Sequence, residues 1–214
     1  MTGDGESPAA AARDARTLHQ RARGALDAVC VVYGIDPRRV YLTSMGGRNG
    51  GLGNAIPVPV PFRRRYLLRY HRCMRDAEPL ALRGLFAHEL MHVVHYSHAS
   101  YGELLGFMGR YVLFLLTAGT RFSAAATWAR ALEHLTDLMA VQRGEAASLA
   151  AWKRFKARAI ERGDICDGLH EMYLSSNEID AVGASDGALK LAVDNCIGTL
   201  ACQDALHPFR RPAS

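Results

Sequence analysis

The run Ala87-His88-Glu89-Leu90-Met91-His92 constrains the fold of this chain more than any other feature. Histidines four positions apart share one face of a helix, so their imidazoles can converge on a single point. Apolar residues recur around the run at helical spacing, at Leu82, Phe86, Leu90, Val93 and Val94. We therefore predict a helix over residues 76–97 that packs one face into the core and presents imidazoles on the other.

The start of this helix and its polar side carry further predictions. Asp76 is a candidate N-cap, Pro79 falls in the first turn, and His95 extends the imidazole side. Two imidazoles with Glu89 beside them provide ligands and a base for a divalent metal ion. We expect His88 and His92 to hold one Zn²⁺ per chain at the floor of a cleft.

Composition is ordinary for a globular protein, with 214 residues, 49% hydrophobic and 22% charged. This length suits one core, so we predict a disordered lead over 1–12, a single domain over 13–205 and a flexible tail over 206–214. The N-terminus lacks a secretory pattern, and five widely spaced cysteines form no C-x-x-C pair. Both observations favour a cytoplasmic protein with reduced thiols.

Hydrophobic periodicity predicts a mostly helical α+β protein with a small sheet. Gly34 and Gly144 are expected helix ends, and Ser185 is an expected N-cap. Pro57, Pro59 and Pro61 alternate, so the missing N–H groups would lie along one side of a strand, which favours a sheet edge or polyproline II. Helices are expected at 8–33, 104–118, 123–143, 149–162 and 185–201, and strands at 40–43, 54–60 and 66–71.

Three other features argue against nucleic-acid binding, a membrane span and a phosphate-binding loop. The net charge is +5, and the only dense basic clusters are Arg63–Arg65 with Arg69 and Arg72, and Arg210-Arg211. No known nucleic-acid-binding module accompanies them, which indicates a solvated basic face and no nucleic-acid partner. The apolar stretch 104–119 is shorter than the ~20 residues of a membrane span, so we expect a buried helix, with a lid or membrane contact as alternatives. The glycine-rich loop 46–53 lacks the P-loop lysine and is expected to be a mobile loop near the cleft.

The third metal ligand has two candidates. Glu133 and Asp137 are four apart on a predicted helix, which suits Glu133 on the metal and Asp137 hydrogen-bonded to the far nitrogen of a ligand histidine. His98 instead completes H-E-x-x-H-x-x-H-x-x-H, a spacing that resembles the metzincin proteases. That scheme needs a backbone reversal at His95, where those enzymes have glycine, and on a continuous helix His98 would point away from the pair.

Four motifs together carry a family resemblance. They are Asn54-Ala55, Leu67-Leu68, the run from Leu85 to His95, and Glu133-x-x-x-Asp137-x-x-Ala140. In this order they resemble the gluzincin metallopeptidases of the CAAX prenyl protease and HtpX type, over residues 54–145. The resemblance implies a zincin-like metallopeptidase fold with a small edge sheet and an active-site helix, with His88, His92 and Glu133 as zinc ligands, Glu89 as general base and Asp137 behind a ligand histidine.

The expected function is therefore zinc-dependent hydrolysis of peptide bonds in a peptide or protein substrate, with water activated by zinc and Glu89 as base. Tyr173 or His170 would donate a hydrogen bond to the oxyanion. Two alternatives remain, a zincin-fold hydrolase of a small-molecule amide and a non-proteolytic zinc-binding regulatory module. The presence of Glu89 favours catalysis, because a structural zinc site needs no base.

Overall fold

The computed structural model describes residues 8–47, 51–58, 64–100, 102–106, 108–109, 112, 124–166 and 172–202. These residues are mostly helical and include one three-stranded sheet, so the prediction of a mostly helical α+β chain is confirmed. Two short 3₁₀ turns, Pro37–Arg39 and Arg72–Asp76, join the larger elements. Those elements are α1 (Pro8–Tyr33), β1 (Val40–Met45), β2 (Gly53–Val58), β3 (Arg65–His71), α2 (Pro79–His98), α4 (Ala124–Gln142), α5 (Ala146–Glu161), α6 (Ser176–Gly183) and α7 (Asp186–Cys202).

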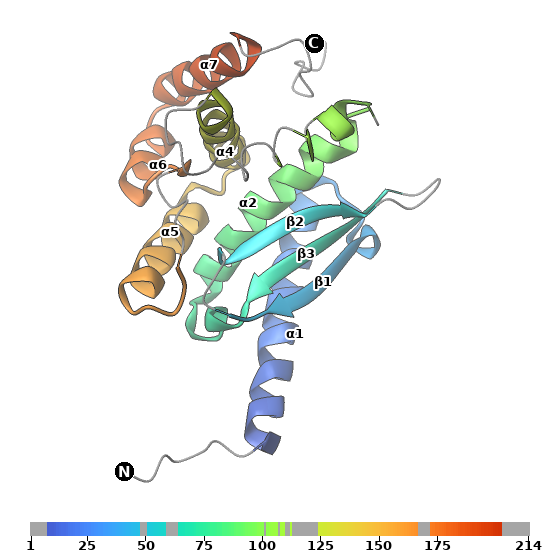
Figure 1. Ribbon diagram of the computed structural model, residues 1–214. Coiled ribbons are helices and arrows are strands. Elements are labelled where there is room, and N and C mark those ends of the chain that lie inside the picture. Colours follow the sequence, from blue (N-terminus) through green and yellow to red (C-terminus); the bar gives the residue numbers. More distant parts are fainter. Residues whose placement is uncertain are drawn as a thin grey trace.

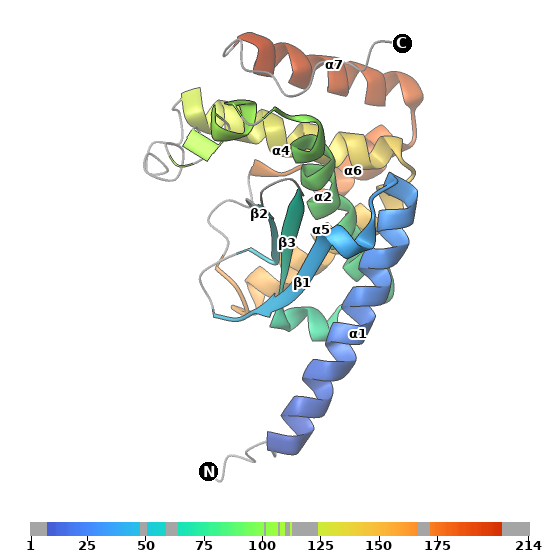
Figure 2. The same cartoon turned by 90° about the vertical axis from the view of Figure 1, so that its right-hand side faces the viewer.

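Helix α2 lies at the centre of the molecule, between the sheet with α1 and the C-terminal helices (Figures 1 and 2). Nearly all of its residues from Ala81 to Tyr96 are buried. The prediction of one core face and one open face is therefore wrong. Small and apolar residues such as Ala81, Leu85 and Met91 also occupy the other sides, so neighbours can pack around the whole helix.

The N-terminus of α2 also differs from the prediction. Asp76 is the last residue of the 3₁₀ turn, and Glu78 occupies the N-cap position without a side-chain cap bond. Pro79 explains the difference, because a proline disfavours helical backbone in the residue before it and is well suited to the first helical position.

The strand order in the sheet is β1-β3-β2, with β1 parallel and β2 antiparallel to β3. Strand β2 is therefore an edge strand, as its prolines predicted. The His71 N–H donates to the Leu52 carbonyl at 2.7 Å, and the register pairs Gly53 with Tyr70. Since pairing alternates along an antiparallel ladder, the backbone groups of Gly53, Ala55 and Pro57 face the outer edge of the sheet, where none of the described strands pairs with them.

Helices α2 and α5 pack with their backbones in direct contact. A Cβ atom on Gly84 would lie 1.9 Å from the Ser148 carbonyl oxygen, so only glycine fits at this crossing. Beside it, the Arg83 guanidinium forms an ion pair with Glu145, and the Ser148 hydroxyl also donates to the Glu145 carboxylate. These contacts fix the position of α5 along α2.

Several predicted helix ends are confirmed. Gly34 and Gly144 adopt φ of +66° and +82°, and the Ser185 hydroxyl accepts a hydrogen bond from the Ala188 N–H at 3.3 Å. Helix α6 was not predicted, although Ser175 and Glu178 form a capping box at its start, an S-x-x-E signal that is visible in the sequence. Helix α1 begins at Pro8, inside the range assigned to the disordered lead.

Part of the chain lies outside the described residues, including 1–7, 206–214 and most of the apolar stretch 104–119. The predictions for these segments stay predictions. Within the described part of the chain, no helix combines the length and the apolar character that crossing a bilayer requires.

Candidate metal centre

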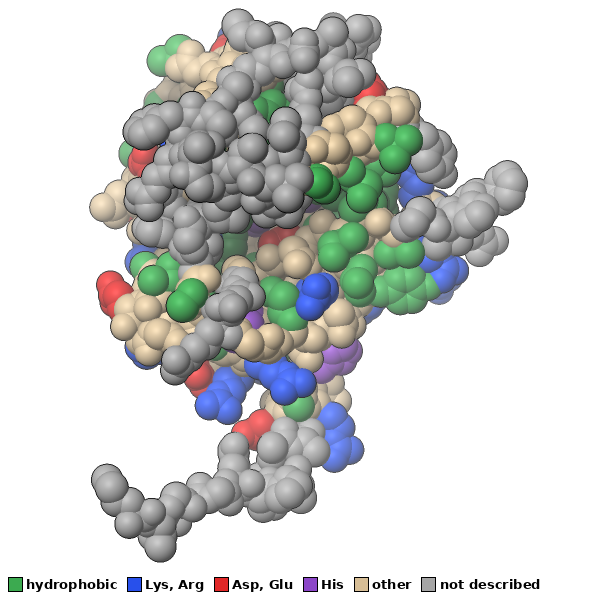
Figure 3. Space-filling model, in the orientation of Figure 1, with side chains coloured by type: hydrophobic (Ala, Val, Ile, Leu, Met, Phe, Trp, Pro, Cys, Tyr) green, Lys and Arg blue, Asp and Glu red, His purple; other side chains and the backbone are tan. Residues whose placement is uncertain are grey.

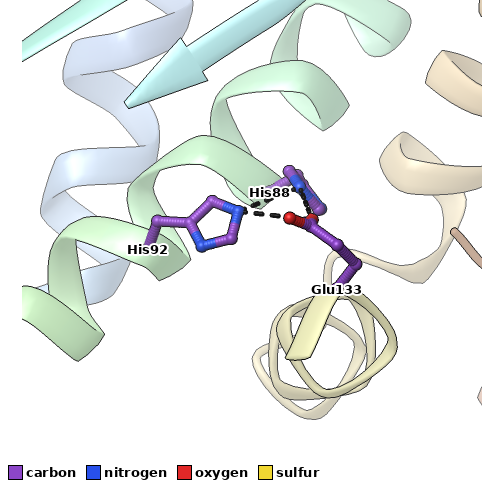
Figure 4. Close-up of side chains that lie close together, drawn as sticks. All are labelled: His88, His92 and Glu133. Carbon is purple, nitrogen blue, oxygen red and sulfur yellow. Dashed lines mark hydrogen bonds and ion pairs between the residues drawn. The ribbon is translucent and has the colours of Figure 1, made fainter. Parts of the chain in front are cut away.

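Three side chains from two helices converge beside the middle of α2 (Figure 4). His88 and His92 come from successive turns of α2, and Glu133 comes from α4. The Nε2 atoms of the two histidines lie 3.3 Å apart, and Glu133 Oε2 lies 3.1 Å from that of His88 and 3.4 Å from that of His92. The three residues that the sequence singled out as ligands are thus brought together.

These separations fit a tetrahedral metal ion. Zinc binds imidazole nitrogen and carboxylate oxygen at about 2.0–2.2 Å, which places neighbouring tetrahedral ligand atoms about 3.3–3.5 Å apart. The three separations in the structure are 3.1, 3.3 and 3.4 Å. A cation held by His88, His92 and Glu133 therefore needs little rearrangement of the side chains.

The buried carboxylate of Asp137 orients His88. Asp137 is fully buried on α4, one turn after Glu133, and its Oδ1 lies 2.7 Å from His88 Nδ1. With Nδ1–H donated to Asp137, a neutral His88 ring presents its Nε2 lone pair toward Glu133 and His92. The arrangement matches the expectation for a carboxylate behind a ligand histidine.

Electrostatics favour a positive charge at this point. Burial disfavours the charged form of His88, but the carboxylates of Asp137 and Glu133 outweigh it and raise the pKa of the imidazole to about 9. Burial would also raise the pKa of Glu133, but His92 and His88 hold it well below its usual value. A proton occupies the cluster near neutral pH, and a divalent cation can take its place.

Glu89 lies next to His88 in the chain, with 5% of its surface exposed. Burial raises the pKa of its carboxyl, against the lowering influence of His88 and His92. The edge strand passes close to it, because a Cβ atom on Gly53 would lie 2.9 Å from Glu89 Oε1. Figure 3 shows acidic and histidine atoms at the surface in a recess beside the sheet.

Trp152 and two lysines from α5, together with Tyr173 from the segment before α6, lie around the ring of His88. Its ring centroid is 5.0 Å from that of Trp152 and 5.5 Å from that of Tyr173. The Lys156 ammonium lies 3.7 Å from the centroid of the Tyr173 ring. Tyr173 thus lies beside the candidate metal site, whereas His170, the alternative oxyanion donor, lies outside the described residues.

His98 does not join the cluster. Helix α2 continues through His95 without a reversal and ends at His98, whose side chain is exposed. His95 is buried, and burial lowers its pKa well below the ordinary value for histidine. The backbone path that the metzincin-like scheme requires is therefore not present.

Two neighbours of the site were not predicted. Trp152 contacts the His88 ring, and the Lys153 ammonium lies 2.8 Å from the Asp137 carboxylate. Both belong to a helix that the sequence did predict, but no spacing relates them to H-E-x-x-H. Their proximity comes from the close packing of α5 on α2.

Comparison with known proteins adds no further constraint. No protein-family model matches the chain, and neither a curated protein nor a solved structure matches it significantly. The interpretation of the site therefore depends on its geometry and on the chemistry of its residues.

Proposed function

We propose that this protein is a zinc-dependent peptidase with a zincin-like fold. The observation that carries the proposal is the convergence of His88, His92 and Glu133 at tetrahedral spacing. Asp137 behind His88 and Glu89 beside it complete the set that hydrolysis needs. A purely structural zinc site usually has four protein ligands, whereas the described residues bring three to this point.

Each residue of the site would have a separate role in the hydrolysis of a peptide bond. A bound zinc ion supplies Lewis acidity, which lowers the pKa of water to about 7 and polarises a carbonyl group. The Glu89 carboxylate accepts the proton of the attacking water and passes it to the departing amine nitrogen. Its raised pKa makes this carboxylate a stronger base than an exposed glutamate. Tyr173 is our candidate for the hydrogen-bond donor to the oxyanion.

The edge strand supports a peptide as the substrate. Gly53 and Ala55 direct their N–H and C=O groups to the outer edge of β2, and Gly53 lies against Glu89. An extended peptide can add to such an edge by backbone hydrogen bonds. Its peptide bonds would then lie close to the Glu89 carboxylate. Pro57 has no N–H to offer, so this pairing covers only a short stretch of substrate.

Metal analysis and a peptide-cleavage assay test the proposal. The purified protein should hold one zinc ion per chain and cleave members of a mixed peptide library. Glu89→Gln should keep the zinc but lose hydrolysis by about 10²–10⁴-fold, because the amide cannot accept a proton. His98→Ala, from the same helix, is the control and should retain both properties. Loss of zinc from a folded Glu89→Gln protein, or its full activity, would contradict the assigned role.

A further inference from the structure

Lys153 is an unusual companion for a metal centre. It lies on α5 with 6% of its side chain exposed, and its Nζ donates to Asp137 Oδ2 at 2.8 Å. The other oxygen of the same carboxylate, Oδ1, accepts from His88 Nδ1 at 2.7 Å. Lysine, aspartate and histidine thus form a buried series of hydrogen bonds that ends at the candidate metal site.

The surroundings hold the lysine in this place. Its Nζ lies 4.3 Å from the ring centroid of Trp152 and 4.4 Å from that of Tyr173, both within range of a cation–π interaction. Burial nevertheless lowers the pKa of Lys153 to about 8, despite the opposite charge of Asp137.

We propose that Lys153 is a positioning residue for the metal centre, where its ammonium holds Asp137 in the orientation in which His88 donates Nδ1–H and offers Nε2 to the ion. This inference rests on the proposed zinc function. Lys153 acts through Asp137 and contacts neither the ion nor the substrate.

The environment of Asp137 shows why the lysine matters. This carboxylate is fully buried, and it accepts hydrogen bonds from the Lys153 ammonium at 2.8 Å and from His88 Nδ1 at 2.7 Å. Among the described residues, the other donor to Oδ2 is the neutral backbone N–H of Leu174, at 3.2 Å. Without the ammonium, the carboxylate would be a buried anion with a weaker set of partners, so it would turn away from His88.

The zinc-affinity test compares two buried lysines of α5. Zinc affinity is measured by chelator competition across a pH series for the wild-type chain, Lys153→Met and Lys156→Met. Lys156 is 5% exposed and also lies over the Tyr173 ring, so it matches Lys153 in burial and in aromatic contacts. We expect Lys153→Met to weaken binding by about 10–100-fold at every pH of the series, and Lys156→Met to change it less than about twofold.

A double-mutant cycle tests whether the lysine acts through Asp137. Once Asp137→Asn has removed the carboxylate, adding Lys153→Met should weaken zinc binding no further. An equally large effect in the Asp137→Asn background, or equal losses from Lys153→Met and Lys156→Met, would show a general packing role and overturn the inference. Wild-type affinity in Lys153→Met, with an unchanged pH dependence, would overturn it as well.

A metal-independent measurement separates this inference from the proposed function. In the metal-free protein, the Nδ1–H proton of His88 should give a slowly exchanging NMR signal in the wild type and in Lys156→Met. Lys153→Met should lose that protection, because the hydrogen bond to Asp137 is no longer held. If the wild type fails to bind zinc, the proposed function fails, yet this signal still decides the role of Lys153. Its persistence in Lys153→Met would refute that role.

Discussion

The crossing of α2 and α5 at Gly84 gives a sharp prediction for stability and for the site. In Gly84→Ala the new methyl carbon would lie 1.9 Å from the Ser148 carbonyl oxygen and 2.9 Å from the Leu149 backbone nitrogen. Both atoms belong to the backbone of α5, so no side-chain rotation can relieve the clash. A carbon–oxygen contact needs about 3.4 Å, so the helices must separate locally by about 1.5 Å.

The cost follows from that displacement. Overpacking that shifts backbone costs about 1–3 kcal/mol and occasionally more, against which alanine gains up to about 1 kcal/mol in helix propensity. Because the required movement is large, we expect a net loss of about 2–3 kcal/mol, or roughly 4–12 °C in Tm for a chain of this size. The same movement would stretch the 2.8 Å bond between Lys153 and Asp137, so zinc affinity should fall together with stability.

Gly24→Ala is the matched control. Gly24 lies inside α1, and within the described structure no atom beyond its own helical surroundings lies within 4 Å of a Cβ placed there. The same substitution should therefore raise Tm by about 1–4 °C through helix propensity alone. Thermal unfolding followed by circular dichroism measures both variants. If Gly84→Ala is as stable as Gly24→Ala, the close contact between α2 and α5 is wrong.

Three further predictions concern the site. Zinc titration should find that Glu133→Ala abolishes tight binding while His98→Ala leaves it nearly unchanged; the reverse pattern would favour the metzincin-like scheme. Gly53→Ala should reduce kcat with zinc retained, because its Cβ would come within 2.9 Å of the Glu89 carboxylate; unchanged kcat would contradict the close approach of β2. Zinc binding at pH 7 should release about one proton, because the pKa of His88 is about 9 and the metal needs the neutral ring. Release should fade and affinity level off above pH 9, and calorimetry in buffers of different ionisation enthalpy measures it.

The sequence predicted the parts of the site that depend on local geometry. His88 and His92 must share a face once the segment is helical, and Glu133 and Asp137 must share one on α4. Gly34 and Gly144 were predicted as helix ends because a left-handed residue is easiest for glycine. These inferences need only the period of one helix, so they hold without knowledge of the tertiary arrangement.

Features that depend on which helices meet could not be predicted in the same way. A lysine is usually exposed, so the pattern of α5 gave no reason to place Lys153 inside the protein. Gly53 and Gly84 look like ordinary glycines until their neighbours on other elements are known. The burial of α2 on every side was missed because a stripe of large apolar residues does not reveal how small residues such as Ala81 are packed.

The path of α2 past His95 explains why this centre depends on tertiary structure. Because the helix does not reverse, it supplies two converging candidate ligands, and the third candidate comes from α4. The position of α4 relative to α2 therefore sets the spacing of the three side chains. Helix α5 contacts α2 at Gly84, and it contacts α4 through the bond between Lys153 and Asp137. An ion that joins two helices stabilises only the folded chain, and it does so in proportion to the logarithm of its concentration over Kd. Packing residues far from any bond to the ion can therefore change metal affinity, and metal occupancy can change the stability of the whole domain.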